Sequence, residues 1–381
     1  MSFPKMRLDK VCRITMGQAP SGDSYNFDGN GLALIAGAGD FGKETPEPKK
    51  YTTAAGKRSE EGEIILCIRA TIGDLNWSDK EYCLGRGVAG LFGHKDKLDQ
   101  KYLWHWLKNV APLLKSKGKG ATFLQVTKED ICSLEIALPP LSEQRRIASI
   151  LDQADELRQK RQQAIEKLDQ LLQATFIDMF GDPVSNPKGW NNCKFENVIE
   201  FVTYGLTVRP EYHEQGIPLI SAREIRTGEL NYDSSPKISK VDFEKLSEKA
   251  KPKQNDILFS KTGSIGHCAI VKDQRDFAVT QNAARVVPRV DVCNPMFLLY
   301  FMRTNYFYNL ANKEAKGNAV KDLQLGIMKS FQVYLPPMEL QDKWAIFAAL
   351  IEKQKNKLET SNEEVSNLFK SLQNQAFNGT L

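Results

Sequence analysis

The sequence predicts an α+β protein in which two mixed α/β domains, related by an internal repeat, are separated by two long helices that pair as an antiparallel coiled coil. The first observation behind this prediction is a repeated turn. Leu138-Pro139-Pro140-Leu141, followed by Gln144, returns as Leu335-Pro336-Pro337-Met338, followed by Gln341. Both the first Leu (335 − 138) and the Gln (341 − 144) are displaced by 197 residues. Because solenoid units are only about 20 to 50 residues long, this offset indicates a duplicated domain.

The second observation is a framework that persists upstream of each turn. Gly31–Ile35 matches Gly216–Ile220 at an offset of 185 residues, Glu63–Leu66 matches Asp256–Phe259 at 193, and Tyr102 matches Phe297 at 195. Apolar, Gly and Pro positions are kept, whereas polar loop residues differ. Two copies of one framework with different surfaces predict two similar binding operations on two different targets.

The third observation is a long apolar stripe after each turn. Apolar residues recur there at spacings of three and four, which is the pattern of a coiled-coil seam. The predicted core of the helix pair consists of Ile147, Leu151, Ala154, Leu168, Leu172, Trp344, Phe347, Ile351, Leu358 and Leu372, in a stripe that also includes Leu157, Thr175, Met179 and Leu368. Arg161, Gln354 and Ser361 interrupt it.

The ends of the first long helix are marked in the sequence. Ser142 is expected to cap its start, and Gly181-Asp182-Pro183 follows its last residue, Phe180. At about 1.5 Å per residue, the helix would be about 58 Å long, far longer than a core helix needs. An identically patterned partner in the same chain makes an intramolecular pair the simplest solution. A homodimeric coiled coil is the alternative.

The segments before each turn have the pattern of mixed α/β structure. Strand-like runs are Ile64–Ile68, Val88–Phe92, Ile257–Phe259 and Ala283–Val287, each bounded by Gly, Asp or Asn. Apolar, aromatic helices are predicted over Tyr102–Val110 and Met296–Leu310. Their aromatic residues are expected to belong to the core.

Composition narrows the class of protein. A chain of 381 residues that is 41% hydrophobic can bury two cores of ordinary size. The sequence has no transmembrane or signal-peptide pattern, so we expect a cytoplasmic protein without a membrane partner. The cysteines are scattered without a CxxC pair, which is typical of buried thiols and predicts neither a disulfide frame nor a metal site. A net charge of +5 is only mildly basic and does not by itself indicate nucleic acid.

One loop looks catalytic at first. Gly37-Ala-Gly-Asp-Phe-Gly-Lys43-Glu44 comes close to a phosphate-binding loop, but Glu44 stands where a magnesium-binding hydroxyl is needed. A Gly-rich surface loop is therefore the favoured interpretation, and a nucleotide hydrolase is the alternative. No Ser, Cys or carboxylate pair stands in a recognisable catalytic setting. We expect a protein that is not an enzyme and binds no cofactor of its own.

Taken together, the repeat, the turn and the long helices resemble the DNA-specificity subunit of type I restriction-modification systems. The segment LPPLSEQRRIASILDQADELRQKRQQAIEKL is particularly similar to that family's central spacer. The second copy departs from it, since Met338-Glu-Leu-Gln-Asp-Lys-Trp344 keeps the Gln and loses the Ser and the Arg pair. The resulting division is residues 1–138 and 191–335 as target-recognition domains, 139–180 and 336–381 as spacer helices, and 181–190 as a linker.

The resemblance implies a non-catalytic subunit that reads two short DNA elements separated by an unread gap, with the helices as a ruler. It implies three kinds of partner: double-stranded DNA, two methyltransferase subunits, and ATP-dependent restriction subunits. S-adenosylmethionine, magnesium and ATP would then belong to those partners. A coiled-coil scaffold that binds only proteins is the alternative, and salt-dependent DNA binding separates the two.

The chemistry of base recognition narrows the candidate DNA-binding residues. Arg or Lys reads guanine, Asn or Gln reads adenine, and small hydroxyls hold phosphates. Polar residues in Gly-containing loops after strand-like runs are therefore the candidates: Arg69, Thr71, Arg86, Lys117, Lys119 and Gln125 in the first half, and Arg209, Arg223, Arg226, Lys261, Thr262, Gln281, Asn282, Lys316 and Lys321 in the second.

Overall fold

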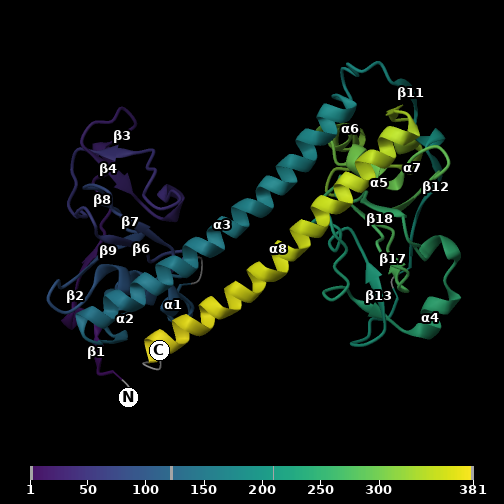
Figure 1. Ribbon diagram of the computed structural model, residues 1–381. Helices are drawn as coiled ribbons and strands as arrows, with labels where there is room; N and C mark the ends of the chain where they lie inside the picture. Colours follow the sequence, from purple (N-terminus) through teal and green to yellow (C-terminus); the bar gives the residue numbers. More distant parts are fainter. Residues whose placement is uncertain (1–2, 121–122, 209, 379–381) are drawn as a thin grey trace. The chain divides into compact units, whose positions relative to one another are not determined.

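The computed structural model describes residues 3–120, 123–208 and 210–378. The chain forms two compact units, and the division falls inside both long helices (Figure 1). Unit 1 contains residues 1–163 and 360–381, and unit 2 contains residues 164–359. Each unit therefore holds one copy of the repeat together with parts of both long helices.

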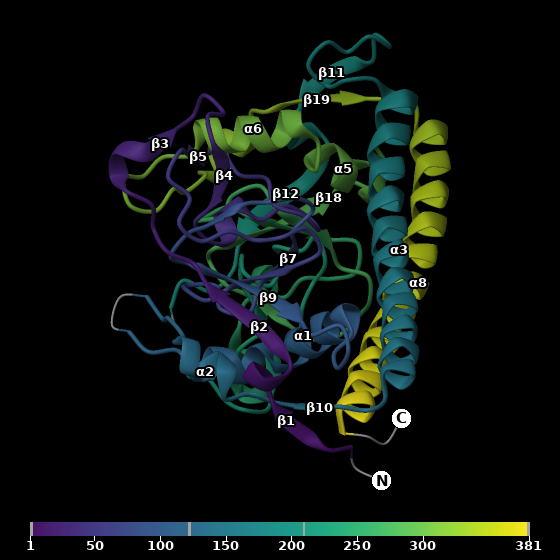
Figure 2. The same ribbon diagram turned by 90° about the vertical axis from the view of Figure 1, so that its left-hand side faces the viewer.

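Unit 1 contains three sheets. The central one is antiparallel, in the order β2 (Cys12–Met16), β9 (Val88–Gly93), β6 (Ile64–Cys67), β7 (Leu75–Trp77). A second has the order β3 (Tyr25–Asn26), β5 (Tyr51–Thr52), β4 (Leu32–Ile35), β8 (Cys83–Leu84), of which β4 and β8 are parallel. The pair β1 (Lys5–Arg7) and β10 (Glu135–Ala137) lies next to the start of the first long helix (Figure 2).

The helices of unit 1 cover this framework. They are α1 (Gln100–Ser116), α2 (Lys128–Cys132), the first part of α3 (Leu141–Phe180) and the last part of α8 (Met338–Asn378), with the 3₁₀ turns η1 (Leu8–Lys10), η2 (Gly22–Ser24) and η3 (Ala38–Asp40). Asp99 caps α1 by accepting from the amides of Lys101 and Tyr102. The main core packs Leu66, Leu91, Tyr102 and Trp106 against the long helices.

Unit 2 repeats the arrangement. Its central antiparallel sheet has the order β12 (Ile199–Tyr204), β18 (Ala283–Pro288), β15 (Ile257–Ser260), β16 (Cys268–Ile270). The sheet β14 (Lys237–Ile238), β13 (Ile217–Ile220), β17 (Ala278–Val279) corresponds to β5, β4 and β8, and β13 and β17 are again parallel. The pair β11 (Asn191–Lys194) and β19 (Gln332–Leu335) corresponds to β1 and β10. The mixed α/β class and the internal repeat are thus confirmed.

The helices of unit 2 differ in part from those of the first copy. They are α4 (Lys240–Lys245), α5 (Pro295–Met302), α6 (Asn305–Glu314), α7 (Leu325–Lys329), the last part of α3 and the first part of α8 (Met338–Asn378), with η4 (Phe195–Asn197) and η5 (Glu248–Ala250). The helix expected over Met296–Leu310 is divided into α5 and α6, because Thr304 caps a new helix by accepting from the amide of Phe307.

Within unit 1, the beginning of α3 lies antiparallel to the end of α8. The Arg158 guanidinium lies over the Phe369 ring at 5.4 Å, and Arg161 Nη1 donates to the Ser361 carbonyl at 2.9 Å. Arg161 and Ser361, which interrupt the apolar stripe, therefore satisfy each other. Because the partner of the later α3 residue is the earlier α8 residue, the direction is antiparallel.

Within unit 2, the end of α3 lies antiparallel to the beginning of α8. Lys355 Nζ donates to Asp169 Oδ1 at 2.8 Å, and the Phe176 and Trp344 rings meet edge to face at 5.2 Å. All ten residues predicted for the helix-pair core are buried or half-buried. Two other positions of the stripe were predicted wrongly, since Leu157 is 44% exposed and Leu368 is 62% exposed.

The repeated turn is held by its Gln in both copies. Gln144 Oε1 accepts from the Asp99 amide at 2.8 Å, and its Nε2 donates to the carbonyls of Lys97 and Pro139. Gln341 accepts from the Asn294 amide at 2.8 Å and donates to the Pro336 carbonyl. Each Gln is buried and ties the start of a long helix to the start of α1 or α5.

The expected Ser142 cap is wrong, because α3 already begins at Leu141. The Pro140 carbonyl accepts from the amides of Glu143 and Gln144, so the chain enters the helix directly from the proline pair. None of the helices in the described residues combines the length and apolarity that crossing a membrane requires. All seven cysteines are free, and all except the half-buried Cys193 are buried.

Candidate nucleic-acid interface

The first copy of the repeat contains a cleft of about 580 Å³. Loops after β4, β6 and β8 line it, together with Ala19, Pro20 and Tyr25 from the segment after β2, and Phe123. Three of the predicted residues, Arg69, Thr71 and Arg86, lie in its wall. None of the described lining residues carries a carboxylate, so the charge of the cleft favours a ligand that presents negative charge or hydrogen-bond acceptors.

A hairpin completes the wall beside Arg69. Lys119 and Gln125 exchange two backbone hydrogen bonds of 3.0 Å, and the Ala70 amide donates to the Leu124 carbonyl at 2.9 Å. The Val126 amide donates to the Ile68 carbonyl at 3.0 Å. These bonds bring the predicted residues Lys119 and Gln125 next to Arg69, although more than 45 residues of sequence separate them. Lys117 lies just before the hairpin, at the end of α1.

Two glycines allow the loops to pack closely around the cleft. A Cβ atom on Gly87 would lie 2.2 Å from the Ala36 carbonyl oxygen. Gly120 has φ +140°, a conformation that L side chains rarely adopt, and a Cβ there would lie 2.2 Å from the Phe123 carbonyl oxygen. Larger residues at either position would push the loops apart.

The Gly37 loop lines this cleft and has no helix after it. The next α-helix is α1, and β5 follows the loop first. A phosphate-binding loop needs the N-terminus of a helix at its end, so the nucleotide-hydrolase alternative loses its structural basis. The loop contributes backbone to the cleft wall instead.

The second copy builds the same hairpin with different side chains. Lys316 and Asp322 exchange backbone hydrogen bonds, and the Gly263 amide donates to the Lys321 carbonyl at 2.9 Å. Asp322 stands at the place of Gln125 (322 − 125 = 197) and accepts hydrogen bonds from both Lys261 Nζ and Thr262 Oγ1. The predicted residues Lys261 and Thr262 are therefore engaged inside the protein.

This contact sets the charge state of the second hairpin. Burial alone would raise the pKa of Asp322, but the hydrogen bonds from Lys261 and Thr262 outweigh burial and hold it below its ordinary value. The carboxylate thus stays ionised opposite the buried Lys261 ammonium. Lys316 and Lys321, both exposed, remain on the outer side of the hairpin.

The remaining predicted residues of the second copy lie on two neighbouring loops. Arg223 and Arg226 are exposed in the loop after β13, where the first copy has its Gly37 loop. Gln281 and Asn282 lie between β17 and β18, and the Asn282 carbonyl accepts from the Lys261 amide at 3.1 Å. Arg209 lies outside the described residues. The two copies thus carry arginine on different loops of one framework.

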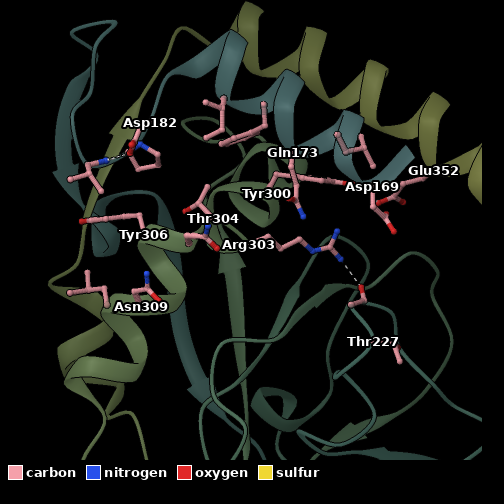
Figure 3. A pocket seen from close by; sticks show the side chains of 18 of the residues that line it. Asp169, Gln173, Asp182, Thr227, Tyr300, Arg303, Thr304, Tyr306, Asn309 and Glu352 are labelled. Atoms are coloured by element: carbon pink, nitrogen blue, oxygen red, sulfur yellow. Dashed lines mark hydrogen bonds between the residues drawn. The ribbon is translucent and has the colours of Figure 1, made fainter. Parts of the chain in front are cut away.

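Unit 2 also contains a larger cavity of about 790 Å³, between the end of α3, the beginning of α8, α5 and α6 (Figure 3). Its wall includes the carboxylates of Asp169, Asp182, Glu229 and Glu352. Arg303 crosses it and donates to the Gly228 carbonyl at 2.6 Å. Arg303, Lys313 and Lys355 line the same wall, so its basic groups are offset by carboxylates and the cavity is a poorer nucleic-acid site than the cleft of unit 1.

Sequence reasoning did not identify Phe123 or Asp322. Phe123 is 56% exposed and lies under the Arg69 guanidinium, 5.5 Å from ring centroid to Cζ. An aromatic residue within the basic, Gly-containing hairpin was the available signal for it. Asp322 could have been found from the repeat, because it is an acid at the position that corresponds to Gln125 in the first copy.

Comparison with known proteins defines the class. A family model described as "Type I restriction modification DNA specificity domain" matches residues 3–167 and 187–365, which is most of the chain. The chain therefore belongs to the family of type I restriction-modification DNA specificity domains and carries two copies of the domain.

Individual relatives agree with this assignment. The type I restriction enzyme EcoBI specificity subunit of Escherichia coli is 24% identical over the whole chain and 86% of its own length. A provisionally named specificity subunit, MjaX of Methanocaldococcus jannaschii, is 37% identical over 42% of the chain, which spans 38% of that protein. The crystal structure of a type I S subunit from M. genitalium has the same fold, with a TM-score of 0.62, 15% identity and coverage of 99% of this chain and 96% of that one.

Proposed function

We propose that this chain is the specificity subunit of a type I restriction-modification enzyme and reads a bipartite DNA target. Residues 1–138 and 191–335 act as target-recognition domains, each reading one short element of double-stranded DNA. The observation that carries the proposal is one loop framework, present twice, with different side chains. Identical frameworks dock on DNA in similar ways, whereas different side chains select different bases.

The long helices serve as the spacer between the two domains. Residues 139–180 and 336–381 form an antiparallel coiled coil, and residues 181–190 link α3 to the second domain. The antiparallel contacts within each unit support this, including the Arg161–Ser361 hydrogen bond and the Lys355–Asp169 ion pair. A spacer of fixed length would set the gap between the two DNA elements.

The chain docks two methyltransferase subunits and ATP-dependent restriction subunits, and performs no bond-making step itself. S-adenosylmethionine, ATP and magnesium are bound by those partners. In the described residues, no group of three or more His, Cys, Asp or Glu side chains is placed to hold a metal ion. The two methyltransferase subunits dock at the equivalent turns held by Gln144 and Gln341, which share one backbone geometry, while the residues beside each turn differ in charge.

The test is a map of methylated sites in cells that contain the complete enzyme. A bipartite motif with a constant gap is expected. Exchanging residues 1–135 for the equivalent region of a relative should change one half of the motif and leave the other intact. If both halves changed together, independent reading by the two domains would be wrong.

The competing function is a coiled-coil scaffold that binds only proteins. Binding of the assembled methyltransferase to DNA, measured at several salt concentrations, distinguishes the two. A DNA reader should show an affinity that falls steeply as salt rises. If the chain is only a scaffold, the affinity of the methyltransferase for DNA should be the same with and without this chain.

A further inference from the structure

We propose that the cleft of the first copy is a guanine-reading site, in which Arg69 and Arg86 recognise guanine in one half of the DNA target. The inference rests on the proposed function and adds to it the class of base and the residues that select it. Guanine presents two acceptors, O6 and N7, to the major groove, and the forked guanidinium group matches both.

The charge of the cleft supports a guanine ligand. Among the described residues of its wall, the charged side chains are those of Arg69 and Arg86, and none carries a carboxylate. In the described residues, no carboxylate forms an ion pair with either arginine side chain. By contrast, Arg13 and Arg58 of the same unit are paired with Glu60 and Glu81. The cleft arginines are therefore available for a ligand.

Arg69 is oriented before any ligand binds. Its guanidinium lies over the Phe123 ring at 5.5 Å, which restricts the orientation of the planar group. Its backbone is fixed as well, since Arg69 and Gln125 form a β-bridge and the neighbouring Ala70 is bonded to Leu124. A guanidinium held in one plane suits the edge of guanine, because the two acceptors of that edge, O6 and N7, are coplanar.

Arg86 projects from a loop that has little freedom. Gly85 and Gly87 flank it, and both pack tightly on the backbone after β4: a Cβ on Gly85 would lie 2.9 Å from Ala36 Cα, and one on Gly87 would lie 2.2 Å from the Ala36 carbonyl oxygen. The Gly85 amide also donates to the Ile35 carbonyl at 2.8 Å. The exposed Arg86 side chain is thus carried on a fixed base at the mouth of the cleft.

The second copy lacks this pair of arginines. Thr262 stands at the place of Arg69 (262 − 69 = 193) and Gln281 at the place of Arg86 (281 − 86 = 195). Thr262 is moreover held by Asp322, which the first copy replaces with Gln125. Guanine reading from these two positions therefore belongs to the first copy, and its loss should affect only one half of the target.

The experiment compares methylated motifs from cells that contain the complete enzyme with wild-type, Arg69→Ala or Arg86→Ala chains. In the wild type, the half read by the first copy should contain guanine on one strand. Each substitution should reduce the preference for guanine at one position by about 10- to 100-fold. The other half of the motif should not change, which also shows that the variant has folded and assembled.

Arg58→Ala is the matched control, because Arg58 is an arginine of the same unit whose partner is Glu81 rather than the cleft. It should leave the motif unchanged. If the cleft variants methylate the same motif more weakly at every site, the arginines contact phosphates and the guanine assignment is wrong. If the wild type gives no bipartite motif, the proposed function itself fails, which is a separate result. Should Arg69→Ala fail to accumulate, the exposed Arg86→Ala variant decides.

Discussion

His105 Nε2 lies 2.8 Å from Asp152 Oδ1 and joins α1 to the first part of α3. Lys101 Nζ reaches the other oxygen of Asp152 at 2.6 Å, and Lys108 pairs with Asp155 one turn further along α3. The second copy places Tyr300 at the equivalent position (300 − 105 = 195), where its hydroxyl donates to Glu352 at 3.2 Å. Both copies thus join a domain helix to a long helix by a polar contact. In the first copy the donor is a histidine, which titrates near neutral pH, whereas in the second it is a tyrosine hydroxyl.

This contact predicts a pH-dependent stability. Burial lowers the pKa of His105 below its ordinary 6.5, although Asp152 opposes the shift. The buried Nδ1 has no hydrogen-bond partner among the described residues, so a proton added there would be unsatisfied. As pH falls below about 6.5, the unfolded chain therefore binds a proton that the folded chain resists. Stability is complete above this pH and is lost as pH falls towards the lowered pKa.

The measurement is the thermal midpoint between pH 7.5 and pH 5. The midpoint of the wild type should fall more steeply than that of His105→Gln, in which an amide can still donate to Asp152 without titrating. His94→Gln replaces an exposed histidine of the same unit and should retain the wild-type slope. Parallel curves for wild type and His105→Gln would mean that His105 does not titrate in this range.

The Gln144 side chain should make a large contribution to stability. Replacing it with Ala leaves the Asp99 amide and the carbonyls of Lys97 and Pro139 without their partner in a buried turn. Unsatisfied buried groups cost about 1–3 kcal/mol each, and water can enter part of the space, so a loss of about 2–4 kcal/mol is expected. Urea unfolding measures it. Gln153→Ala, an exposed position on α3, should change the free energy of unfolding by less than about 0.5 kcal/mol.

The fold was predicted well where periodicity and repetition agree. The strands Ile64–Ile68 and Val88–Phe92 lie within one residue of β6 and β9, because short apolar runs bounded by Gly or Asp leave little choice. The helix stripe was predicted less accurately. Thr175 and Met179 were expected in the seam, yet the adjacent Phe176 and Phe180 are more deeply buried. Thr175 and Met179 lie on one possible stripe and Phe176 and Phe180 on a neighbouring one. The rings of Phe176 and Phe180 pack on Phe297, which selects the second stripe.

The site was predicted only in part, for a different reason. Placing candidates in Gly-containing loops after strands found Arg69 and Arg86, since the loops after β6 and β8 line the same cleft. The ion pair between Lys261 and Asp322 could not be found in this way, because 61 residues separate the two and only the folded hairpin brings them together. Whether a basic residue faces a ligand or an internal partner is decided by such contacts.

The antiparallel pairing of the long helices predicts an intramolecular crosslink. Cysteines introduced at Arg161 and Ser361, which are hydrogen-bonded in unit 1, should be joined by a short thiol-reactive crosslinker within single chains, even at high dilution. Denaturing gel electrophoresis reports the result. Cysteines at Leu157 and Leu368, both on exposed faces, form the control pair and should be joined poorly. Products that link two chains and disappear on dilution would instead indicate a homodimeric coiled coil.

The two basic hairpins predict a salt-dependent effect without a change in sequence preference. Lys117 and Lys119 precede Gly120, and Lys316 precedes Gly317, at equivalent places of the repeat (317 − 120 = 197). Lysine is a flexible point charge without the planar fork of arginine, so contact with phosphates is expected rather than base reading. Replacing Lys117 and Lys119 with Ala in the assembled methyltransferase should weaken binding to all DNA sequences by a similar factor. The slope of log affinity against log salt should become smaller by about one to two units, since each phosphate contact contributes about 0.9.

Filter or fluorescence binding at several salt concentrations, with cognate and unrelated duplexes, measures both quantities. Lys160→Ala is the control, because Lys160 is an exposed lysine on α3 that pairs with Glu156 and lies away from the hairpin in sequence. It should leave the salt slope unchanged. A double variant that keeps the full slope on both duplexes would place the first hairpin off the DNA. A variant that no longer discriminates between the two duplexes, at an unchanged salt slope, would show that these lysines read bases. The assignment of base reading to the cleft arginines and phosphate contact to the hairpin lysines would then be wrong.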